Sequence, residues 1–180
     1  MKDLTKVVTG PKTRFSYANV WEPRKVNGDR AKYSICLIIP KEDGETLSKV
    51  EQAIAEAYRL GQEKLTGADG KTVPLSSLTL PLRDGDMDRR EDTVYRHAYY
   101  INARSDIPPG IVDKNLNRIT EKSGFYSGCY GRASIHFYAF SYDGKMGIAC
   151  GLNNLQKLAD GPVLGNWSTP EEDFGDEIFR

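Results

Sequence analysis

Histidine and cysteine are scarce in this chain of 180 residues, which contains two histidines and three cysteines. Cys36, Cys129 and Cys150 are odd in number and have no Cys-x-x-Cys spacing, so we expect buried, reduced thiols rather than a zinc site. No Ser-His-Asp, Cys-His or phosphate-loop pattern is visible either. The sequence therefore predicts a protein without catalytic activity, cofactor or metal.

Long apolar runs are also lacking. Crossing a bilayer takes about 20 apolar residues, and the runs near the ends of this chain are far shorter. The first ten residues, MKDLTKVVTG, include no apolar signal region. We therefore expect a cytoplasmic protein with no membrane contact, and a chain of this length predicts one domain with its own core.

The net charge is zero, but the charge is unevenly distributed. Residues 171–180 hold five of the 25 acidic residues and one of the 25 basic residues, which leaves 20 acidic and 24 basic residues elsewhere, a charge of +4. We predict a folded domain over residues 1–166 and a disordered or extended acidic tail over residues 167–180, because the tail is too polar to bury much surface. The tail either binds the basic surface or a partner protein, or serves only as a solubilising end. Its candidate contact residues are Glu171, Glu172, Asp173, Phe174, Asp176, Glu177, Ile178 and Phe179.

The most informative stretch is Gly124–Gly151, in which apolar and other residues alternate strictly from Arg132 to Tyr142. Such alternation predicts a strand with two different faces. One face carries Ala133, Ile135, Phe137 and Ala139, and the other carries Arg132, Ser134, His136, Tyr138 and Phe140. Asp143-Gly144 predicts a hairpin turn, with Met146–Cys150 as the returning strand. A face of cations and aromatic rings can bind nucleic acid, because cations neutralise phosphates and rings stack on bases. A ladder of aromatic residues packed under a loop would show the same pattern.

Three further strands and one helix are predicted. The strands are Thr13–Val20, ended by Pro23, Arg30–Ile39 and Thr93–Ser105. The helix covers about Thr46–Leu65, where apolar residues recur at spacings of three and four. A loop is expected over Gly67–Asp92, and a short helical turn is expected within Gly151–Gly165.

In the predicted loop, Asp84, Asp86 and Asp88 have the spacing of the first three calcium-loop ligands. However, Arg89 occupies the position of the turn glycine, and Tyr95 that of the bidentate glutamate. A solvated loop is therefore favoured over a metal site.

Five runs together resemble a family of single-stranded DNA-binding proteins from tailed phages and prophages. They are FSYANVWEP (residues 15–23), KYSICLIIPK (32–41), PLRDGD (81–86), YINARS (100–105) and the long run from Tyr126 to Gly165. The resemblance implies a mainly β protein with an OB fold, a five-stranded Greek-key barrel with an inserted helix and long loops. It also implies sequence-tolerant binding of single-stranded DNA in phage replication or recombination, inside the bacterial host cell.

We predict that arginines neutralise phosphates and that aromatic rings stack on bases. The predicted nucleic-acid-binding residues are Arg14, Tyr17, Trp21, Lys32, Arg96, Tyr100, Arg104, Tyr126, Tyr130, Arg132, His136 and Tyr138.

Two other functions stay open at this point. One is a protein-interaction or virion module that uses the aromatic sheet face. The other is a metal-dependent nuclease built on Asp84, Asp86 and Asp88, although two-metal chemistry needs carboxylates from separate elements. Pairing of an exposed edge strand would give a homodimer, and the choice between DNA and RNA is open.

Overall fold

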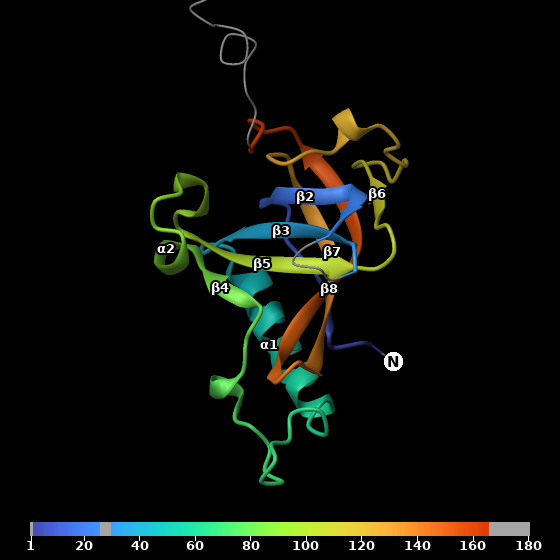
Figure 1. Ribbon diagram of the computed structural model, residues 1–180. Coiled ribbons are helices and arrows are strands. Elements are labelled where there is room, and N and C mark those ends of the chain that lie inside the picture. The colour runs from blue at the N-terminus through green and yellow to red at the C-terminus, as the bar shows by residue number, and fades with distance from the viewer. Residues whose placement is uncertain (1, 26–29, 166–180) are drawn as a thin grey trace, which may run out of the picture.

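The computed structural model describes residues 2–25 and 30–165 (Figure 1). The described chain is mainly β, with one long helix inserted between two strands of a mixed sheet. The strands are β1 (Lys6–Val8), β2 (Thr13–Arg24), β3 (Lys32–Pro40), β4 (Leu82–Asp84), β5 (Ala98–Ser105), β6 (Gly110–Val112), β7 (Tyr130–Tyr142) and β8 (Lys145–Ala159). The α-helices are α1 (Gly44–Leu60) and α2 (Gly85–Asp88), and the 3-10 turns are η1 (Leu75–Ser77), η2 (Thr93–Tyr95) and η3 (Lys122–Gly124).

Five of the strands follow one another around a ring. β2, β3 and β5 pair antiparallel in that order, β5 meets β8 in parallel, β8 pairs with β7, and β7 returns to β2. The two closing contacts are short: Arg104 pairs with Gly151 between β5 and β8, and two residue pairs join β2 to β7. The ring is therefore only partly closed. β1 adds to β7, β4 to β5 and β6 to β8.

The predicted hairpin is confirmed, and its apolar side fills the ring. Ala133, Ile135, Phe137 and Ala139 are buried in the main core, whereas Arg132 and Tyr138 are exposed on the other side. Asp143 and Gly144 both have positive φ angles, 51° and 77°, as a two-residue turn between antiparallel strands requires. β3 and β5 add Ile35, Leu37, Ile39, Ile101 and Ala103 to the same core.

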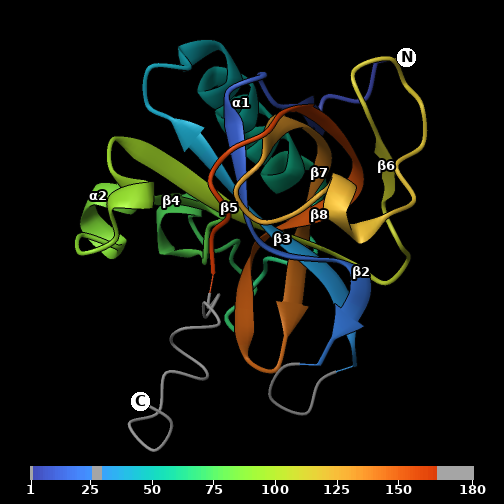
Figure 2. The same cartoon turned by 90° about the horizontal axis from the view of Figure 1, so that it is seen from above.

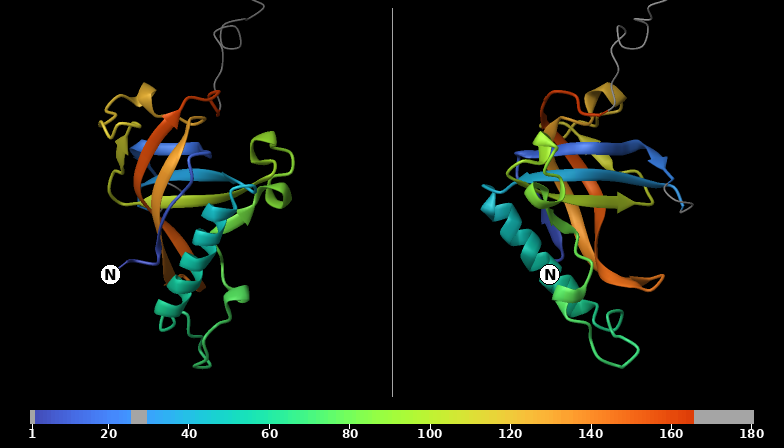
Figure 3. Two further views of the ribbon diagram at one scale, coloured as in Figure 1. Left: turned by 180° about the vertical axis from the view of Figure 1, so that it is seen from behind. Right: turned by 60° about the vertical axis from the view of Figure 1, so that its left-hand side comes forward.

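Helix α1 packs against β7 and β1 and covers one end of the ring (Figure 3). Asp43 caps its start by accepting a hydrogen bond from the Thr46 N–H, and Val50, Ala53, Ile54 and Ala57 form its buried side. A Cβ atom at Gly61 would lie 2.2 Å from the Cβ of Ala139. Glycine at this position therefore allows the end of the helix to meet β7.

Several predicted boundaries are wrong. β2 continues through Pro23 to Arg24, because two register shifts leave that end of the strand irregularly paired and the missing N–H of proline costs little. β8 extends to Ala159, where a helical turn was expected, because β7 supplies pairing partners along its whole length. The predicted strand Thr93–Ser105 begins only at Ala98, and the predicted loop contains β4 and α2.

The three cysteines are buried and free, as predicted. Burial raises the pKa of the Cys36 thiol to about 11. In the described part of the chain, no helix is both long and apolar enough to span a bilayer. The acidic tail predicted over residues 167–180 lies outside the described residues.

Candidate nucleic-acid interface

The outer side of β2, β3 and β5 carries a polar surface that residues 2–25 and 30–165 leave partly or fully exposed. Arg24 pairs with Lys32, Asn19 with Ser34, and Ser34 with Arg104, so these residues share one side of the sheet. The Asn19 amide donates to the Ser34 hydroxyl at 3.3 Å, which confirms that the two side chains meet. We call this surface the open face and define it by Asn19, Arg24, Lys32, Ser34, Asn102 and Arg104.

Lys32 on the open face and Arg30 next to it are weakly paired. Lys32 Nζ lies 3.9 Å from Asp106 Oδ1, and Arg30 Nε lies 3.9 Å from the same oxygen. Exposed pairs of this length contribute little to stability. Separating Lys32 and Arg30 from Asp106 would therefore cost little free energy.

The opposite end of the same sheet surface is covered. Tyr95 and Tyr100 pack on Cys36, Ile38 and Ala98 and form a second buried cluster outside the ring. The segment that contains α2 and η2 lies over these residues. Tyr100 is 5% exposed, and its hydroxyl lies 3.2 Å from Asp88 Oδ2.

Arg89 ends α2 and lies among three tyrosine rings. Its guanidinium carbon is 4.7 Å from the ring centre of Tyr95, 4.9 Å from that of Tyr100 and 5.7 Å from that of Tyr17. A cation over aromatic faces is stabilised by about 0.5–2 kcal/mol per favourable ring. The side chain is thus held at the border between the covered and open ends of the sheet.

Lys41 fixes the position of α2. Its Nζ lies 2.9 Å from both Asp84 Oδ1 and Asp86 Oδ2, and hydrogen bonds from Lys41 are the largest cause of the lowered pKa of both carboxyls. Asp84 also accepts from the Asp86 N–H, and Asp86 accepts from the His97 N–H. An ammonium group thus occupies the position that the nuclease hypothesis would give to a metal ion, which argues against that hypothesis.

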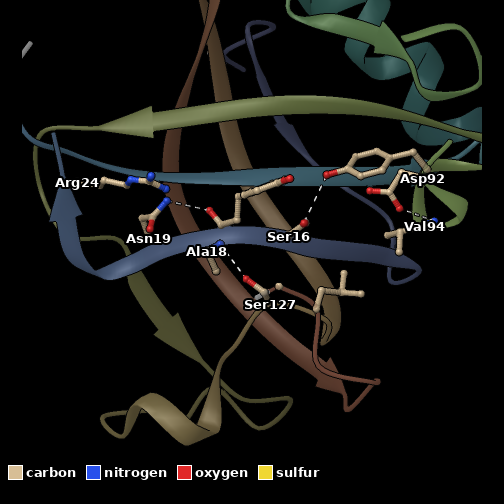
Figure 4. Close-up of a pocket in the computed structure, with 11 residues that line it drawn as sticks. Ser16, Ala18, Asn19, Arg24, Asp92, Val94 and Ser127 are labelled. Carbon is tan, nitrogen blue, oxygen red and sulfur yellow. Dashed lines mark hydrogen bonds between the residues drawn. The ribbon is translucent and has the colours of Figure 1, made fainter. Parts of the chain in front are cut away.

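A hollow of about 510 Å³ runs along β2 beside the open face (Figure 4). Arg24 lies at one end, Asp92 and Val94 lie at the other, and Ser16, Asn19 and Ser127 lie between them. Tyr17 also lines the hollow and is 57% exposed, with a positive φ of 46°. The register between β2 and β3 shifts at this point, so Tyr17 projects from a bulge rather than from a regular pair.

Tyr138 stands beside the other border of the open face, on β7. It is 42% exposed and stacks on His136, with ring centres 5.6 Å apart and planes 30° apart. Burial raises the pKa of the Tyr138 phenol, and the nearby charge of Arg104 acts against that shift. His136 Nδ1 lies 2.8 Å from Asn153 Oδ1, and its ring covers Gly151, so this histidine supports the tyrosine.

The structure therefore brings together five of the predicted binding residues: Tyr17, Lys32, Arg104, His136 and Tyr138. It places the others elsewhere. The prediction that Tyr100 stacks on a base is wrong, because this residue is 5% exposed and its ring has no free face.

Four other predicted residues have structural contacts. Trp21 donates from Nε1 to the Phe125 carbonyl at 2.9 Å and packs on the core. The Tyr126 hydroxyl lies 2.8 Å from Asp160 Oδ1. Arg14 donates to the carbonyls of Gly128 and Pro162 and lies over the ring of Tyr130. These contacts hold the segments around β2 together.

Arg132 and Arg96 also lie away from the open face. Arg132 is on the outer side of β7, where it donates to Gln156 Oε1 from both Nε and Nη2. It is six residues from Tyr138, roughly 20 Å along a strand. Arg96 precedes β5 and ends the turn η2.

Four residues of the open face were not among the predicted binding residues: Asn19, Arg24, Ser34 and Asn102. Arg89, at its border, was not predicted either. Ser34 lies two residues after Lys32, and Asn102 lies two residues before Arg104, so the spacing alone could have placed them on the same side of their strands as these cations. Arg89 had no such signal, because its place depends on a four-residue helix in a segment rich in charge.

One family model and one relative match nearly the whole chain. A family model described as "Enterobacter phage Enc34, ssDNA-binding protein" matches residues 5–179. Protein p50 of Acyrthosiphon pisum secondary endosymbiont phage 1 is 30% identical over 170 residues, which cover 91% of this chain and 89% of that protein.

Two solved structures are similar in fold. One is the single-stranded DNA-binding protein from bacteriophage Enc34 in complex with single-stranded DNA (ssDNA), with a TM-score of 0.77 and 21% identity over 89% of this chain and 90% of that one. The other is gp2.5, a single-stranded DNA-binding protein encoded by bacteriophage T7, with a TM-score of 0.52 and 14% identity over 96% and 95% of the two chains.

Proposed function

Because this chain belongs to the family of the Enterobacter phage Enc34 ssDNA-binding protein, we propose that it binds single-stranded DNA across the open face. The family is defined by DNA binding rather than by catalysis. The observation that carries the proposal is a polar row between two exposed tyrosines, Tyr17 and Tyr138. In this row Lys32 and Ser34 are half-buried, and Asn102 and Arg104 are exposed. Cations beside aromatic rings are what a flexible strand of phosphates and bases requires.

We interpret the ring as an OB fold. If β2, β3, β5, β7 and β8 are taken as strands 1 to 5, their order around the ring is 1-2-3-5-4, with strands 3 and 5 parallel. OB folds bind oligonucleotides on the surface of strands 2 and 3 and with the loops that join strands 1 to 2 and 4 to 5. Here that surface is the open face.

The two flanking connections support this interpretation. The end of β2, the start of β3 and the turn between β7 and β8 extend to the same side of the molecule (Figures 2 and 3). Arg24, Lys25 and Arg30 lie next to the first connection, and Lys145 lies next to the second. A bound strand leaving the open face on this side would meet further positive charge.

The expected binding is tolerant of sequence. Lys32, Arg24 and Arg104 would neutralise phosphates, which carry no sequence information. Tyr138 would stack on a base, and every base offers a π face. We further propose that residues 1–166 form the DNA-binding domain, that the acidic tail acts on this domain or on replication and recombination proteins, and that the protein works in the cytoplasm of the phage host.

The test is a fluorescence anisotropy titration of labelled oligo-dT, oligo-rU and duplex DNA at two salt concentrations. The proposal predicts that oligo-dT binds more tightly than duplex and that its affinity falls as salt rises, because phosphate contacts release counterions. Equal affinity for the duplex, or an affinity for oligo-dT that salt does not change, would overturn the proposal. The oligo-rU titration measures the preference for DNA over RNA.

A further inference from the structure

Arg89 is a cation enclosed by uncharged rings. Within residues 2–25 and 30–165, no carboxylate lies at ion-pair distance from its guanidinium, and its Nε is buried without a hydrogen-bond partner. Tyr95, Tyr100 and Tyr17 surround it at 4.7, 4.9 and 5.7 Å. Aromatic faces stabilise a cation without neutralising it. Arg89 therefore retains its charge for a ligand.

The backbone segment that carries Arg89 is also ordered before any ligand arrives. The Arg89 N–H donates to the Gly85 carbonyl at 3.0 Å and closes α2. The two carboxylates bound by Lys41 precede Arg89 in the same segment, and Asp88 accepts from the Tyr100 hydroxyl. A segment that is ordered in advance does not have to be ordered on binding, so less entropy is lost.

Tyr17 provides an exposed ring beside this cation. Its backbone is in the left-handed region, at a φ of 46°, which is uncommon for a bulky residue. The residue is 57% exposed although it lines the hollow along β2. A folded structure that keeps a large ring in this conformation and in contact with water presents a surface on which a base can stack.

We propose that Tyr17 and Arg89 form a one-nucleotide subsite at the α2 end of the open face, with a base on the free side of Tyr17 and its neighbouring phosphate on Arg89. The inference rests on the proposed function and extends the bound strand past Asn19 to the hollow of Figure 4. The hollow gives the unstacked nucleotide room, because about 510 Å³ falls within the size range of sites for small ligands. The site takes a nucleotide unit of a single strand, since a paired base would have no free face.

The two residues should have separable effects. Arg89→Gln removes one phosphate contact, so it should weaken oligo-dT binding and reduce the slope of log Kd against log salt by about 0.7. Arg89→Lys keeps the charge and should restore the slope while recovering affinity only in part, because a lysine lacks the planar fork. The neighbouring exposed Arg90→Gln is the matched control and should leave affinity nearly unchanged.

The tyrosine variants test stacking. Tyr17→Asn tolerates the left-handed backbone but lacks the ring, so it should weaken binding about 5- to 150-fold without changing the salt slope. Tyr17→Phe keeps the ring and should bind like the wild type. The melting temperature of each variant, measured alongside, separates a lost contact from a lost fold.

A second measurement does not depend on variants. Photo-crosslinking of oligo-dT that carries 5-iodouracil, followed by peptide mass spectrometry, should place a crosslink on Tyr17. If the wild-type protein fails to bind oligo-dT, the proposed function itself fails. If it binds, yet Tyr17→Asn and Arg89→Gln match the Arg90→Gln control and no crosslink falls on Tyr17, only this subsite is overturned.

Discussion

Two neighbouring aromatic residues on β7 should respond in opposite ways to the same truncation. Phe137 is 2% exposed and faces the core, whereas Tyr138 is 42% exposed and faces the open side. We predict that Phe137→Ala lowers stability and leaves DNA affinity nearly intact, and that Tyr138→Ala lowers affinity with little loss of stability. The pair shares a strand and a ring size, so burial is the main difference between them.

The magnitudes follow from that burial. Removing a buried phenylalanine costs about 3–5 kcal/mol, and a protein of this size loses about 2–4 °C of melting temperature per kcal/mol. Phe137→Ala should therefore lower the melting temperature by at least about 6 °C. Tyr138→Ala removes mainly the stacking on His136 and should cost about 1 kcal/mol or less. Each stacked base contributes about 1–3 kcal/mol to binding, so Tyr138→Ala should raise the Kd for oligo-dT about 5- to 150-fold.

Thermal unfolding by circular dichroism and anisotropy titration of oligo-dT measure the two effects on the same samples. The titration is performed below the melting temperature that circular dichroism gives for each variant. A large drop in melting temperature for Tyr138→Ala, with unchanged affinity, would place that ring in the structural framework and refute its role in stacking.

Three further predictions concern the framework and the tail. Lys41 lowers the pKa of Asp84 and Asp86 below their ordinary 3.8. The two ionised carboxylates therefore stabilise the folded state above pH 3.8, and this stabilisation is lost as the pH falls through their lower pKa values in the folded state. The free energy of urea unfolding should accordingly depend less on pH, between about pH 5 and 2, in Lys41→Met than in the wild type. Equal pH profiles would contradict it. Deleting residues 171–180 should tighten oligo-dT binding if the tail competes for the basic surface, and unchanged or weaker binding would exclude self-competition. A Cβ at Gly131 would lie 1.8 Å from a β8 carbonyl oxygen, so Gly131→Ala should lower the melting temperature; an unchanged value would show that the β7–β8 pairing adjusts.

The core-facing side of the strands was predictable from the alternation of apolar and other residues. A period of two along β7 identified the side that contains Ile135 and Phe137 because a core selects apolar side chains at every second position. The hairpin turn was predictable because Asp-Gly readily adopts two positive φ angles. Strand ends were less predictable, since β2 passes through Pro23 where its pairing is irregular.

Which residues on the outer side of the sheet are exposed depends on the segments that fold back over it. Alternation placed Tyr100 and Arg104 on the same side of β5, and this is correct, but α2 covers one and leaves the other open. A four-residue helix has no periodicity that a sequence can reveal. The partly closed ring also gives two residues of β7 different neighbours. Tyr138 lies near Arg104 of β5, whereas Arg132 lies beside Gln156 of β8.

The most direct test of the account is a map of where the DNA lies. In an NMR titration of the protein with a short oligo-dT, the largest amide shifts should fall on Lys32, Ser34, Asn102, Arg104 and Tyr138, with small shifts along α1. Large shifts around Arg132 or α1, with none on the outer side of β3 and β5, would contradict the account.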